Sequence, residues 1–387
     1  MQPRLGFVWL TILCLVLCVV SSASPLLISP APAYYPRTIV LRNTTHFAVV
    51  EKPLGNYSRL VLVAQLNSNS SQPWAEQAVI AQDNTSGVDL ANGFLLELED
   101  GTLLCAYRHH IWNGSSRVYR IQLSASSDGG RSWALKSTIW SGDTGVWEPY
   151  LYTHSLTPSI VRVLYSLELT NGGEQDIVQQ ESSDGGSTWG SISLRIHTKG
   201  SRNGMPGAVE LADGSILFVF EGFWGAGWGH FTVNSVRSLD GGQTWTDAAV
   251  IYAPSFANNA GSPQVGVCSS GAIWVVFMCN QRAEATAAPL HPTHIQPQPA
   301  SARLAQPAPR WPDGAHIWAC RSSLNTTRPS QPLQWSGPQL LPSPDPTAPA
   351  DTALWPSLLH TPAPSPLLAL VYQSGGGAAV MSADSLC

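Results

Sequence analysis

The chain has 387 residues, of which 44% are hydrophobic and 15 are tryptophan, so it can bury a large core. Charged residues make up only 12%, and the formal net charge is −5. With no basic stripe along the sequence, this balance excludes nucleic acid as an expected partner, because phosphate binding needs clustered lysine and arginine.

The N-terminal residues have the parts of a secretory signal peptide. Arg4 precedes an apolar run over residues 7–20, and Ser21, Ser22 and Ala23 form a small-residue cleavage site. The run is shorter than the roughly 20 residues that span a bilayer, and a retained signal anchor is the alternative. We expect residues 1–23 to be removed and the mature protein to be extracellular, in the medium or the cell wall, without a membrane partner.

Sequons and cysteines fit the same compartment. The Asn-x-Ser/Thr sequons are Asn43, Asn56, Asn69, Asn84, Asn113 and Asn325. Two of the seven cysteines, Cys14 and Cys18, lie in the signal. The remaining five are an odd number, which allows at most two disulfides of undetermined connectivity. No His/Cys spacing resembles a zinc site, and we expect no cofactor and no metal.

One motif, S-x-D-x-G-x-x-W, occurs three times at a constant spacing. Its aspartates are Asp128, Asp184 and Asp240. A fixed period of this size predicts one supersecondary unit per repeat. Asp-Gly-Gly between β-rich runs predicts a hairpin turn, in which glycine supplies the positive φ and the carboxylate accepts backbone N–H bonds. The motif resembles the Asp-box of sialidase-like β-propellers, and we expect its aspartates to be structural.

Two further elements recur between these motifs. Apolar runs that end on an aromatic residue, such as Phe220 before Glu221, predict strands entered from glycine turns. An X-Pro pair, such as Glu148-Pro149, predicts where another strand begins, because proline is confined to strand starts and edges. The predicted unit is strand, turn, strand, loop, strand, Asp-box turn, strand, which is typical of a propeller blade.

The proline spacing predicts the number of units. Pro149, Pro206 and Pro263 are equally spaced, but the interval from Pro263 to Pro356 is much longer. The excess falls on residues 283–312, rich in Pro, Ala, Gln and His, which we expect to be a disordered insertion. Residues 24–387 are then one all-β domain, a six-bladed β-propeller of four-stranded antiparallel blades. The last blade has room for three strands, so we expect residues 26–29 to complete it.

Two units present a glutamate at positions that vary from unit to unit. Glu148 stands at a strand-one start and Glu221 after a strand-two aromatic, both among apolar and aromatic residues. A carboxylate there is costly unless it is paired, hydrogen-bonded or functional. Two carboxylates facing one channel are the minimum equipment of a glycosidase. The alternative is a purely structural salt bridge from each glutamate to a channel arginine, such as Arg37 or Arg108.

Four segments resemble glycoside hydrolase family 93, which contains exo-acting α-L-arabinanases on six-bladed propellers. They are residues 147–151 (WEPYL), 175–178 (QDIV), 202–206 (RNGMP) and 219–221 (VFE). The resemblance covers roughly residues 35–381 and implies a retaining mechanism, with Glu148 as nucleophile and Glu221 as acid/base. The insertion, a degenerate fifth clasp at residues 322–325 and the abrupt C-terminus depart from the pattern and leave the identity of the sugar open.

Candidates for substrate contact are aromatic, cationic and polar residues at repeat-equivalent positions or in these segments. They are Arg37, Arg108, Trp147, Tyr165, Asp176, Arg202, Trp224, Gln264 and Trp355. The acidic group of Glu168, Glu174 and Asp176 is either a set of solvated loop charges or a source of substrate contacts. We expect a monomer that acts on a polysaccharide or oligosaccharide.

Two other functions compete with the arabinanase-like one. An exo-α-sialidase shares the Asp-box propeller but needs an arginine cluster for the sugar carboxylate, which Arg37, Arg108 and Arg321 could supply. Its usual opening of aromatic-Arg-Ile-Pro is absent, since the order here is Tyr35-Pro36-Arg37. A catalytically inactive propeller that binds glycan or protein is the third alternative.

Overall fold

The computed structural model describes residues 26–387 apart from several segments. Those outside it are 54–57, 66–72, 115, 225–229, 247, 256–257, 282–314, 324–332, 342–352, 361–367 and 375–376. The predicted signal (1–23), the predicted insertion (283–312) and the sequons at Asn56, Asn69 and Asn325 therefore lie outside the described residues, as does the side chain of Asn113.

The described residues form antiparallel strands and no helix, so the prediction of an all-β fold of four-stranded sheets is confirmed. The first sheet contains β2 (Tyr34–Val40), β3 (His46–Glu51), β4 (Ser58–Gln65) and β5 (Ala75–Asp83). The second contains β6 (Val88–Glu97), β7 (Leu103–Asn113), β8 (Ser116–Ser126) and β9 (Ala134–Gly142).

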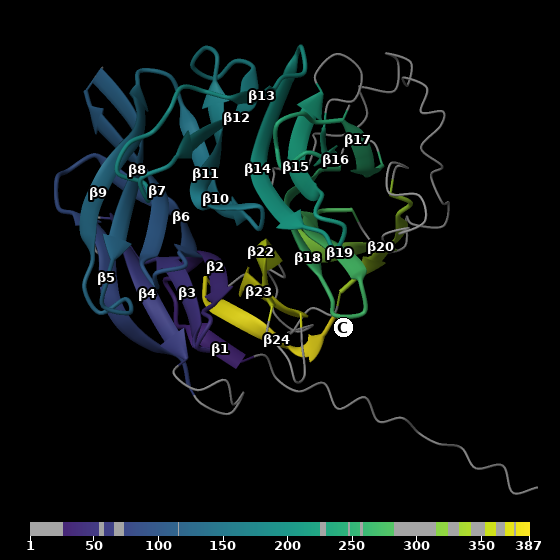
Figure 1. The fold of residues 1–387 in the computed structure, drawn as a ribbon, viewed down its shortest axis with the longest axis horizontal. Helices are drawn as coiled ribbons and strands as arrows, with labels where there is room; N and C mark the ends of the chain where they lie inside the picture. The colour runs from purple at the N-terminus through teal and green to yellow at the C-terminus, as the bar shows by residue number, and fades with distance from the viewer. Residues whose placement is uncertain are drawn as a thin grey trace, which may run out of the picture.

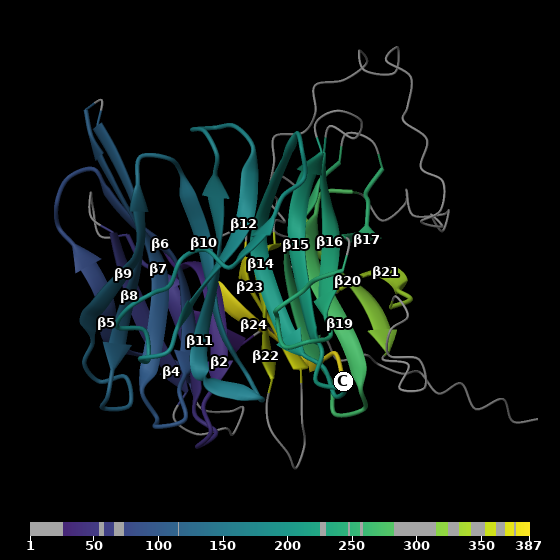
Figure 2. The ribbon, with the colours of Figure 1, turned by 45° about the horizontal axis from the view of Figure 1, so that its top comes forward.

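An eight-stranded sheet follows, made of two sets of four strands. One set is β10 (Val146–His154), β11 (Thr157–Glu168), β12 (Gln175–Ser182) and β13 (Leu194–Ile196). The other is β14 (Ser201–Glu210), β15 (Ile216–Trp224), β16 (Phe231–Ser238) and β17 (Ala249–Tyr252). The sets are joined by one parallel pairing between Gln175 of β12 and Arg202 of β14, and Figure 2 shows β12 beside β14.

Two more sheets complete the described structure. One contains β18 (Ala260–Val267), β19 (Ala272–Cys279), β20 (His316–Ser323) and β21 (Ser336–Leu340). The other contains β22 (Ala353–His360), β23 (Leu368–Ser374), β24 (Ala379–Ser385) and β1 (Leu26–Ser29). β1 pairs with β24, so residues 26–29 supply the fourth strand of the last sheet, as predicted (Figure 1).

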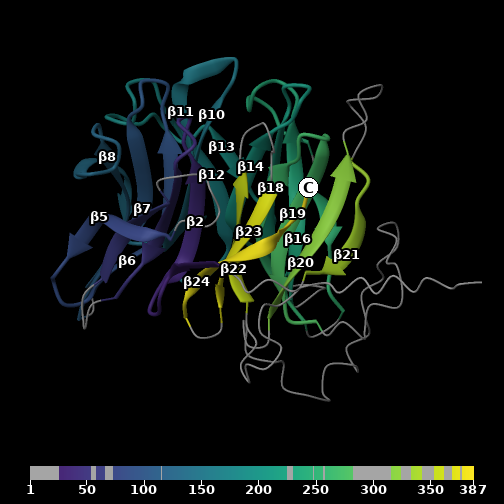
Figure 3. The ribbon, with the colours of Figure 1, turned by 90° about the horizontal axis from the view of Figure 1, so that it is seen from below.

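The first strands of successive sheets or sets contact one another in a cycle. β2 contacts β6, and the contacts continue through β10, β14, β18 and β22 back to β2. Figure 3 shows β22 between β2 and β18. The first strands therefore line a common centre, and the apolar core lies between neighbouring sheets. Phe47 and Leu62 of the first sheet, for example, share a buried cluster with Leu95 and Tyr107 of the second.

The three Asp-box motifs form turns between the third and fourth strands of their units. In the first, the Asp128 carboxylate accepts bonds from the Arg131 and Ser132 backbone N–H groups at 3.0 and 2.9 Å. The Ser126 hydroxyl donates to Asp128 at 2.8 Å and accepts from Gly130 N–H at 2.9 Å. Asp184 and Asp240 make the corresponding bonds. Each motif is a self-contained clasp for its turn.

A β-bulge interrupts every first strand. The bulged residues share a left-handed backbone conformation, with φ between 47° and 55°; they are Tyr35, Asn92, Glu148, Met205, Ser262 and Trp355. Five precede a proline, and Gly93 follows Asn92. The prediction that these prolines mark strand starts is wrong, since β10 begins three residues before Pro149. Proline is tolerated inside the strand because bulging leaves the local ladder disrupted, so its missing N–H costs no hydrogen bond.

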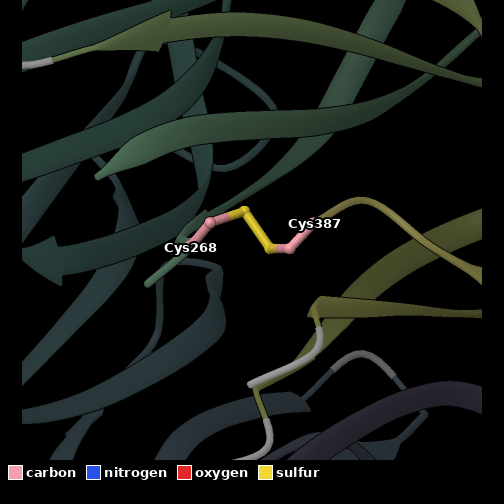
Figure 4. Close-up of a disulfide and its surroundings, with 2 residues drawn as sticks. All are labelled: Cys268 and Cys387. Atoms are coloured by element: carbon pink, nitrogen blue, oxygen red, sulfur yellow. A yellow bond between two sulfur atoms is a disulfide. The ribbon is translucent and has the colours of Figure 1, made fainter. Parts of the chain in front are cut away.

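A disulfide joins Cys268, between β18 and β19, to Cys387, beyond β24 (Figure 4). It ties the last sheet to the preceding one. Cys105, Cys279 and Cys320 are buried free thiols. Within the described segments, one disulfide thus forms, against the two that the cysteine count allows. No helix there is long and apolar enough to cross a membrane.

Candidate active site

Glu148 is the bulged residue of β10. Its Oε2 accepts hydrogen bonds from the Ser166 hydroxyl at 3.0 Å and from the Met205 backbone N–H at 3.4 Å. Ser166 lies on β11 of the same set, and Met205 is the bulged residue of β14 in the next. The carboxylate is therefore held from two sides, while its other oxygen has no hydrogen-bond partner among the described residues.

Glu221 lies on β15, opposite Gly204 of β14. Its Oε2 accepts the backbone N–H of Ser262, the bulged residue of β18, at 2.7 Å. Like Glu148, it bonds through one oxygen to the bulged residue of the next first strand and leaves the other oxygen without a partner in the described structure. Both side chains are enclosed but keep some accessible surface, as a group that meets a ligand must.

Gly204 brings the two carboxylates together. A methyl group in place of its hydrogen would lie 3.5 Å from Glu148 Oε2 and 3.5 Å from Glu221 Oε1. These two oxygens can therefore be no farther apart than the sum of those two distances. The missing side chain leaves room for Gln175, whose Nε2 would lie 3.0 Å from the same methyl group.

The two carboxyl groups have different electrostatic surroundings. Burial and the neighbouring Glu148 charge raise the pKa of Glu221 to about 8, against the smaller opposing effects of the Ser262 N–H and Arg202. Burial also raises the pKa of Glu148, but Arg108, the Ser166 hydroxyl, the Met205 N–H and Arg202 all oppose it. With a pKa of about 8, Glu221 holds a proton near neutral pH, and the charge of Glu148 is one of the causes of that raised pKa.

Arg202 is anchored beside this pair by Glu168. Its Nη2 donates to Glu168 Oε1 at 2.7 Å and to Gln175 Oε1 at 2.9 Å. Glu168 also accepts the Gly172 N–H at 2.8 Å and the Trp147 Nε1–H at 3.3 Å. Burial would raise the pKa of Glu168, but these hydrogen bonds outweigh it and lower the pKa. Glu168 is thus a buried ion-pair partner, not a solvated loop charge.

Arg108 and Arg37 lie nearby with their own partners. Arg108 pairs with Asp89 at 2.7 Å, and its guanidinium carbon lies 5.1 Å from the centre of the Trp147 ring. Arg37 Nη1 donates to the carbonyls of Pro36, Trp355 and Pro356 at 3.0 to 3.3 Å. Neither arginine forms a salt bridge with Glu148 or Glu221 in the described residues, which removes the structural alternative considered for the two glutamates.

The other candidate residues have different positions. Trp355 is a bulged residue whose ring centre lies 5.9 Å from that of Tyr35, and Gln264 follows the β18 bulge. Tyr165 is fully buried in the core, where its hydroxyl donates to Gln180 at 2.6 Å, so it has no surface for a sugar. Asp176 is buried and paired with Arg195 and His197. The side chain of Trp224 lies outside the described part of the structure.

Glu51 is a further enclosed carboxyl group that the sequence analysis did not single out. It ends β3, and burial raises its pKa to about 7 despite the nearby Arg108. Its unit has Val50 where other units carry an aromatic residue. The pattern of aromatic residues therefore did not show that Glu51 is equivalent to Glu221. A spacing signal existed, because Glu51 follows Tyr35 at the same interval at which Glu221 follows Met205.

Two other features of the described residues lie apart from the carboxylate pair. No three His, Cys, Asp or Glu side chains of the described segments converge so as to hold a metal ion. A cavity of about 320 Å³ is lined by later residues of the same first strands, including Ile39, Leu95, Leu151 and Val209. It contains neither glutamate, so it is distinct from the carboxylate site.

Comparison with known proteins agrees with this architecture. Residues 44–221 match the BNR repeat-like domain family. No curated protein matches the sequence. Among solved structures, the chain is similar to an α-L-arabinanase of Penicillium chrysogenum complexed with arabinobiose, at 18% identity and a TM-score of 0.61. It is also similar to the family 93 α-L-arabinofuranosidase of Fusarium graminearum, at 20% identity and a TM-score of 0.62. Both comparisons cover 94% of this chain and 98% of the other.

A sialidase is a more distant structural neighbour. The NanB sialidase of Streptococcus pneumoniae shares 10% identity and a TM-score of 0.59, over 94% of this chain and 70% of the other. The predicted resemblance to glycoside hydrolase family 93 is thus confirmed. The chain has the propeller-like fold of these family 93 glycoside hydrolases and sialidases, and its residues 44–221 match the BNR repeat-like domain family.

Proposed function

We propose that this protein is a secreted, exo-acting glycoside hydrolase that releases neutral sugar, arabinose or a short arabino-oligosaccharide, from an α-L-arabinan-like substrate. The observation that carries the proposal is the enclosed pair Glu148 and Glu221, whose facing oxygens each lie 3.5 Å from one point beside Gly204. Acid-assisted cleavage of a glycosidic bond requires two carboxyl groups with different pKa values.

The proposed mechanism is a retaining double displacement. Glu148 attacks the anomeric carbon while Glu221 donates its proton to the leaving oxygen; Glu221 then takes a proton from the water that hydrolyses the glycosyl-enzyme. The pKa of about 8 at Glu221 supports the acid role, and the hydrogen bonds and cations around Glu148 support the nucleophile role. Retaining enzymes hold the two carboxyl groups about 5 to 5.5 Å apart, and inverting ones about 6.5 to 9.5 Å. Each of the two facing oxygens lies 3.5 Å from one shared point, which is compatible with the separation of a retaining enzyme and supports that mechanism.

The arrangement of the rest of the molecule supports a closed ring of six four-stranded blades, and we propose that the protein is a monomer. The contacts among first strands return to β2 after six strands, and β1 completes the last sheet. Extracellular location is proposed from the signal-like residues 1–23 and from the sequons. Asn43 and Asn84 among these are exposed, as glycan attachment requires.

The state of the arginines favours a neutral sugar over a sialic acid. A sialidase needs a cluster of arginines free to bind the sugar carboxylate. Arg108 is neutralised by Asp89 and Arg202 by Glu168, whereas Arg321 lies exposed on the third strand β20. Arg37 keeps one unpartnered Nη2, but a single group does not make a cluster.

A panel of substrates tests this function. The protein, expressed with its own leader, is incubated with linear arabinan, arabinobiose, aryl α-L-arabinofuranoside and aryl sialoside. We expect release of arabinose or arabinobiose with retained anomeric configuration by NMR. Cleavage of the sialoside alone would replace the proposal with a sialidase. Binding of arabinan without cleavage of any substrate would replace it with a glycan-binding propeller.

A further inference from the structure

The feature that carries a further inference is the repeat relation between Glu51 and Glu221. Glu221 pairs with Gly204 just before the β14 bulge, and Glu51 pairs with Tyr34 just before the β2 bulge. Each carboxylate accepts the backbone N–H of the bulged residue in the next sheet. The distances are 2.7 Å for Glu221 to Ser262 and 2.6 Å for Glu51 to Asn92. The chain therefore presents a second carboxyl group in the setting of Glu221.

Glu51 belongs to the same space as the carboxylate pair. Tyr35 of β2 and Met205 of β14 meet, with the Tyr35 hydroxyl 3.7 Å from Met205 Sδ. Tyr35 therefore reaches from the sheet of Glu51 to the strand opposite Glu221. The charges of Glu148 and Glu51 both act on the Tyr35 hydroxyl, and Arg108 acts on both glutamates. Glu51 and Glu148 thus share Tyr35 and Arg108 as neighbours.

Several polar atoms around Glu51 lack partners. Glu51 Oε2 accepts no hydrogen bond from the described residues. Asn92 Oδ1 and Arg108 Nε are buried without a partner, and Asn92 is only 7% exposed. Buried polar atoms are normally hydrogen-bonded, because each unpaired one costs about 1–3 kcal/mol. Two acceptors and one donor in one place match the hydrogen-bonding capacity of sugar hydroxyl groups.

The charge of this group selects the kind of ligand. Glu51, Asp89 and Glu148 surround Arg108, so an anionic sugar would meet more negative than positive charge there. A hydroxyl can donate to the carboxylate and accept from the guanidinium. The Trp147 ring beside Arg108 adds an aromatic wall.

We propose that Glu51, with Asn92 and Arg108, forms a subsite that binds the hydroxyl groups of a neutral sugar unit beside the Glu148 and Glu221 pair. Glu51 accepts a hydrogen bond from one sugar hydroxyl and determines specificity for it. The inference rests on the proposed function, and names the part of the substrate that this side of the site recognises.

The test compares Glu51→Gln with a matched control, Glu97→Gln. Glu97 also accepts a backbone N–H across the first two sheets, from Arg42 at 2.8 Å, but on a later part of β6 than the bulge. Both variants lose one carboxylate and keep an acceptor oxygen. We expect Glu51→Gln to lower kcat/KM for aryl α-L-arabinofuranoside by about 10- to 100-fold, since a charge-assisted hydrogen bond is lost. Glu97→Gln should stay within about twofold of the parent.

Deoxy substrates separate recognition from a structural effect. Each monodeoxy analogue of the arabinoside is assayed with the parent and with Glu51→Gln. The parent should lose most of its kcat/KM with one analogue, and Glu51→Gln should lose much less with that same analogue, because its partner is already gone. Asn92→Gly keeps the left-handed backbone, removes Oδ1 and serves as the second variant.

Three results would overturn the subsite. In the first, the parent is active and Glu51→Gln has the same kcat/KM as Glu97→Gln. In the second, the parent is active and each deoxy analogue lowers kcat/KM by the same factor in Glu51→Gln as in the parent. Either outcome refutes the subsite and leaves the proposed function standing. If the parent cleaves no glycoside, calorimetry with arabinobiose decides. Binding that weakens in Glu51→Gln upholds the subsite without catalysis, and no binding by the parent refutes both.

Discussion

The carboxylates at the centre of the molecule and those of the Asp-box turns are the same chemical group in opposite settings. In the turns, the hydroxyl and backbone N–H groups of Ser132, Thr188 and Thr244 lead a set of donors that lower the aspartate pKa values. At the centre, burial raises the pKa values of Glu51, Glu148 and Glu221. The turn carboxylates are fully satisfied, whereas each central one retains an oxygen without a partner in the described structure.

This difference distinguishes carboxylates that stabilise the fold from carboxylates that are available for a reaction. A group whose hydrogen bonds are all used inside one turn has nothing left for a ligand, and it stabilises its ionised form locally. A group held by one oxygen in an enclosed site keeps its second oxygen and a displaced pKa for reaction. The Asp-box aspartates therefore serve the fold, whereas the central glutamates keep the properties that the proposed chemistry needs.

The largest expected effect comes from the central pair. Glu148→Gln and Glu221→Gln should each reduce kcat/KM by about 1,000-fold or more, because nucleophilic and acid/base steps are lost. Azide should restore turnover in Glu221→Gln only, since a small anion can attack the glycosyl-enzyme without a general base. Circular dichroism checks that both variants are folded. If either variant kept turnover close to that of the parent, the central carboxylates would be no more reactive than those of the turns.

The second prediction concerns stability against pH. The folded-state pKa of Glu221 is raised to about 8 from an ordinary value near 4.5, so its contribution is complete below pH 4.5 and is lost as pH rises through 8. Glu221→Gln should unfold with a free energy on the order of 1–3 kcal/mol higher than the parent at pH 8, and with little difference at pH 4.5. Urea denaturation at both pH values measures this. If the free energies of unfolding of parent and variant differed by the same amount at both pH values, burial would not raise the pKa of Glu221.

Glu168 offers a smaller effect that sharpens the comparison. In Glu168→Gln, Arg202 keeps its bonds to the Gly173 carbonyl and Gln175, but its charge is no longer neutralised. The unbalanced cation should lower the pKa of Glu221 and move the alkaline limb of the kcat/KM profile down by roughly 0.5–1 pH unit. Glu174→Gln, in the same loop, is the control and should leave the limb in place. If the alkaline limb of the kcat/KM profile did not move in Glu168→Gln, Glu168 would have no positioning role.

The smallest effect on activity is expected in the turns. Asp184→Ala removes the acceptor for the Ser187 and Thr188 N–H groups, so the melting temperature should fall. Values of kcat and KM for the folded protein should remain within about twofold of the parent. Differential scanning fluorimetry and initial rates provide the two readings. A selective loss of turnover would give the turn a chemical role.

Regular signals in the sequence predicted most of the architecture. The Asp-box period, the X-Pro pairs and the leftover β-rich residues 26–29 predicted four-stranded sheets and the strand that completes the last one. The prolines were misplaced because a bulge, invisible in a pattern of residue types, lets proline lie inside a strand. Glu148 and Glu221 stood out by their aromatic context. Glu51 did not, because Val50 broke the aromatic pattern that identified its equivalents.

Long-range packing decided what remained. Tyr165 shares its apolar context with the proposed site residues, but the side of the strand that it faces places it in the core. The partners of Arg108 and Arg202 lie 19 and 34 residues away in sequence, and no local motif joins them. Such pairings follow from how neighbouring sheets approach, which one sequence alone does not encode in a readable form.

The bulges within the first strands have a consequence for how such a protein can change. Each one presents its residue from the same left-handed backbone conformation, whether that residue is Tyr35, Asn92, Glu148, Met205, Ser262 or Trp355. Side chains of very different size and charge are accepted there without altering the strand. The bulge positions can therefore be substituted while the backbone of the centre stays the same. A new substrate preference could arise, by evolution or by design, from a substitution at one of these positions.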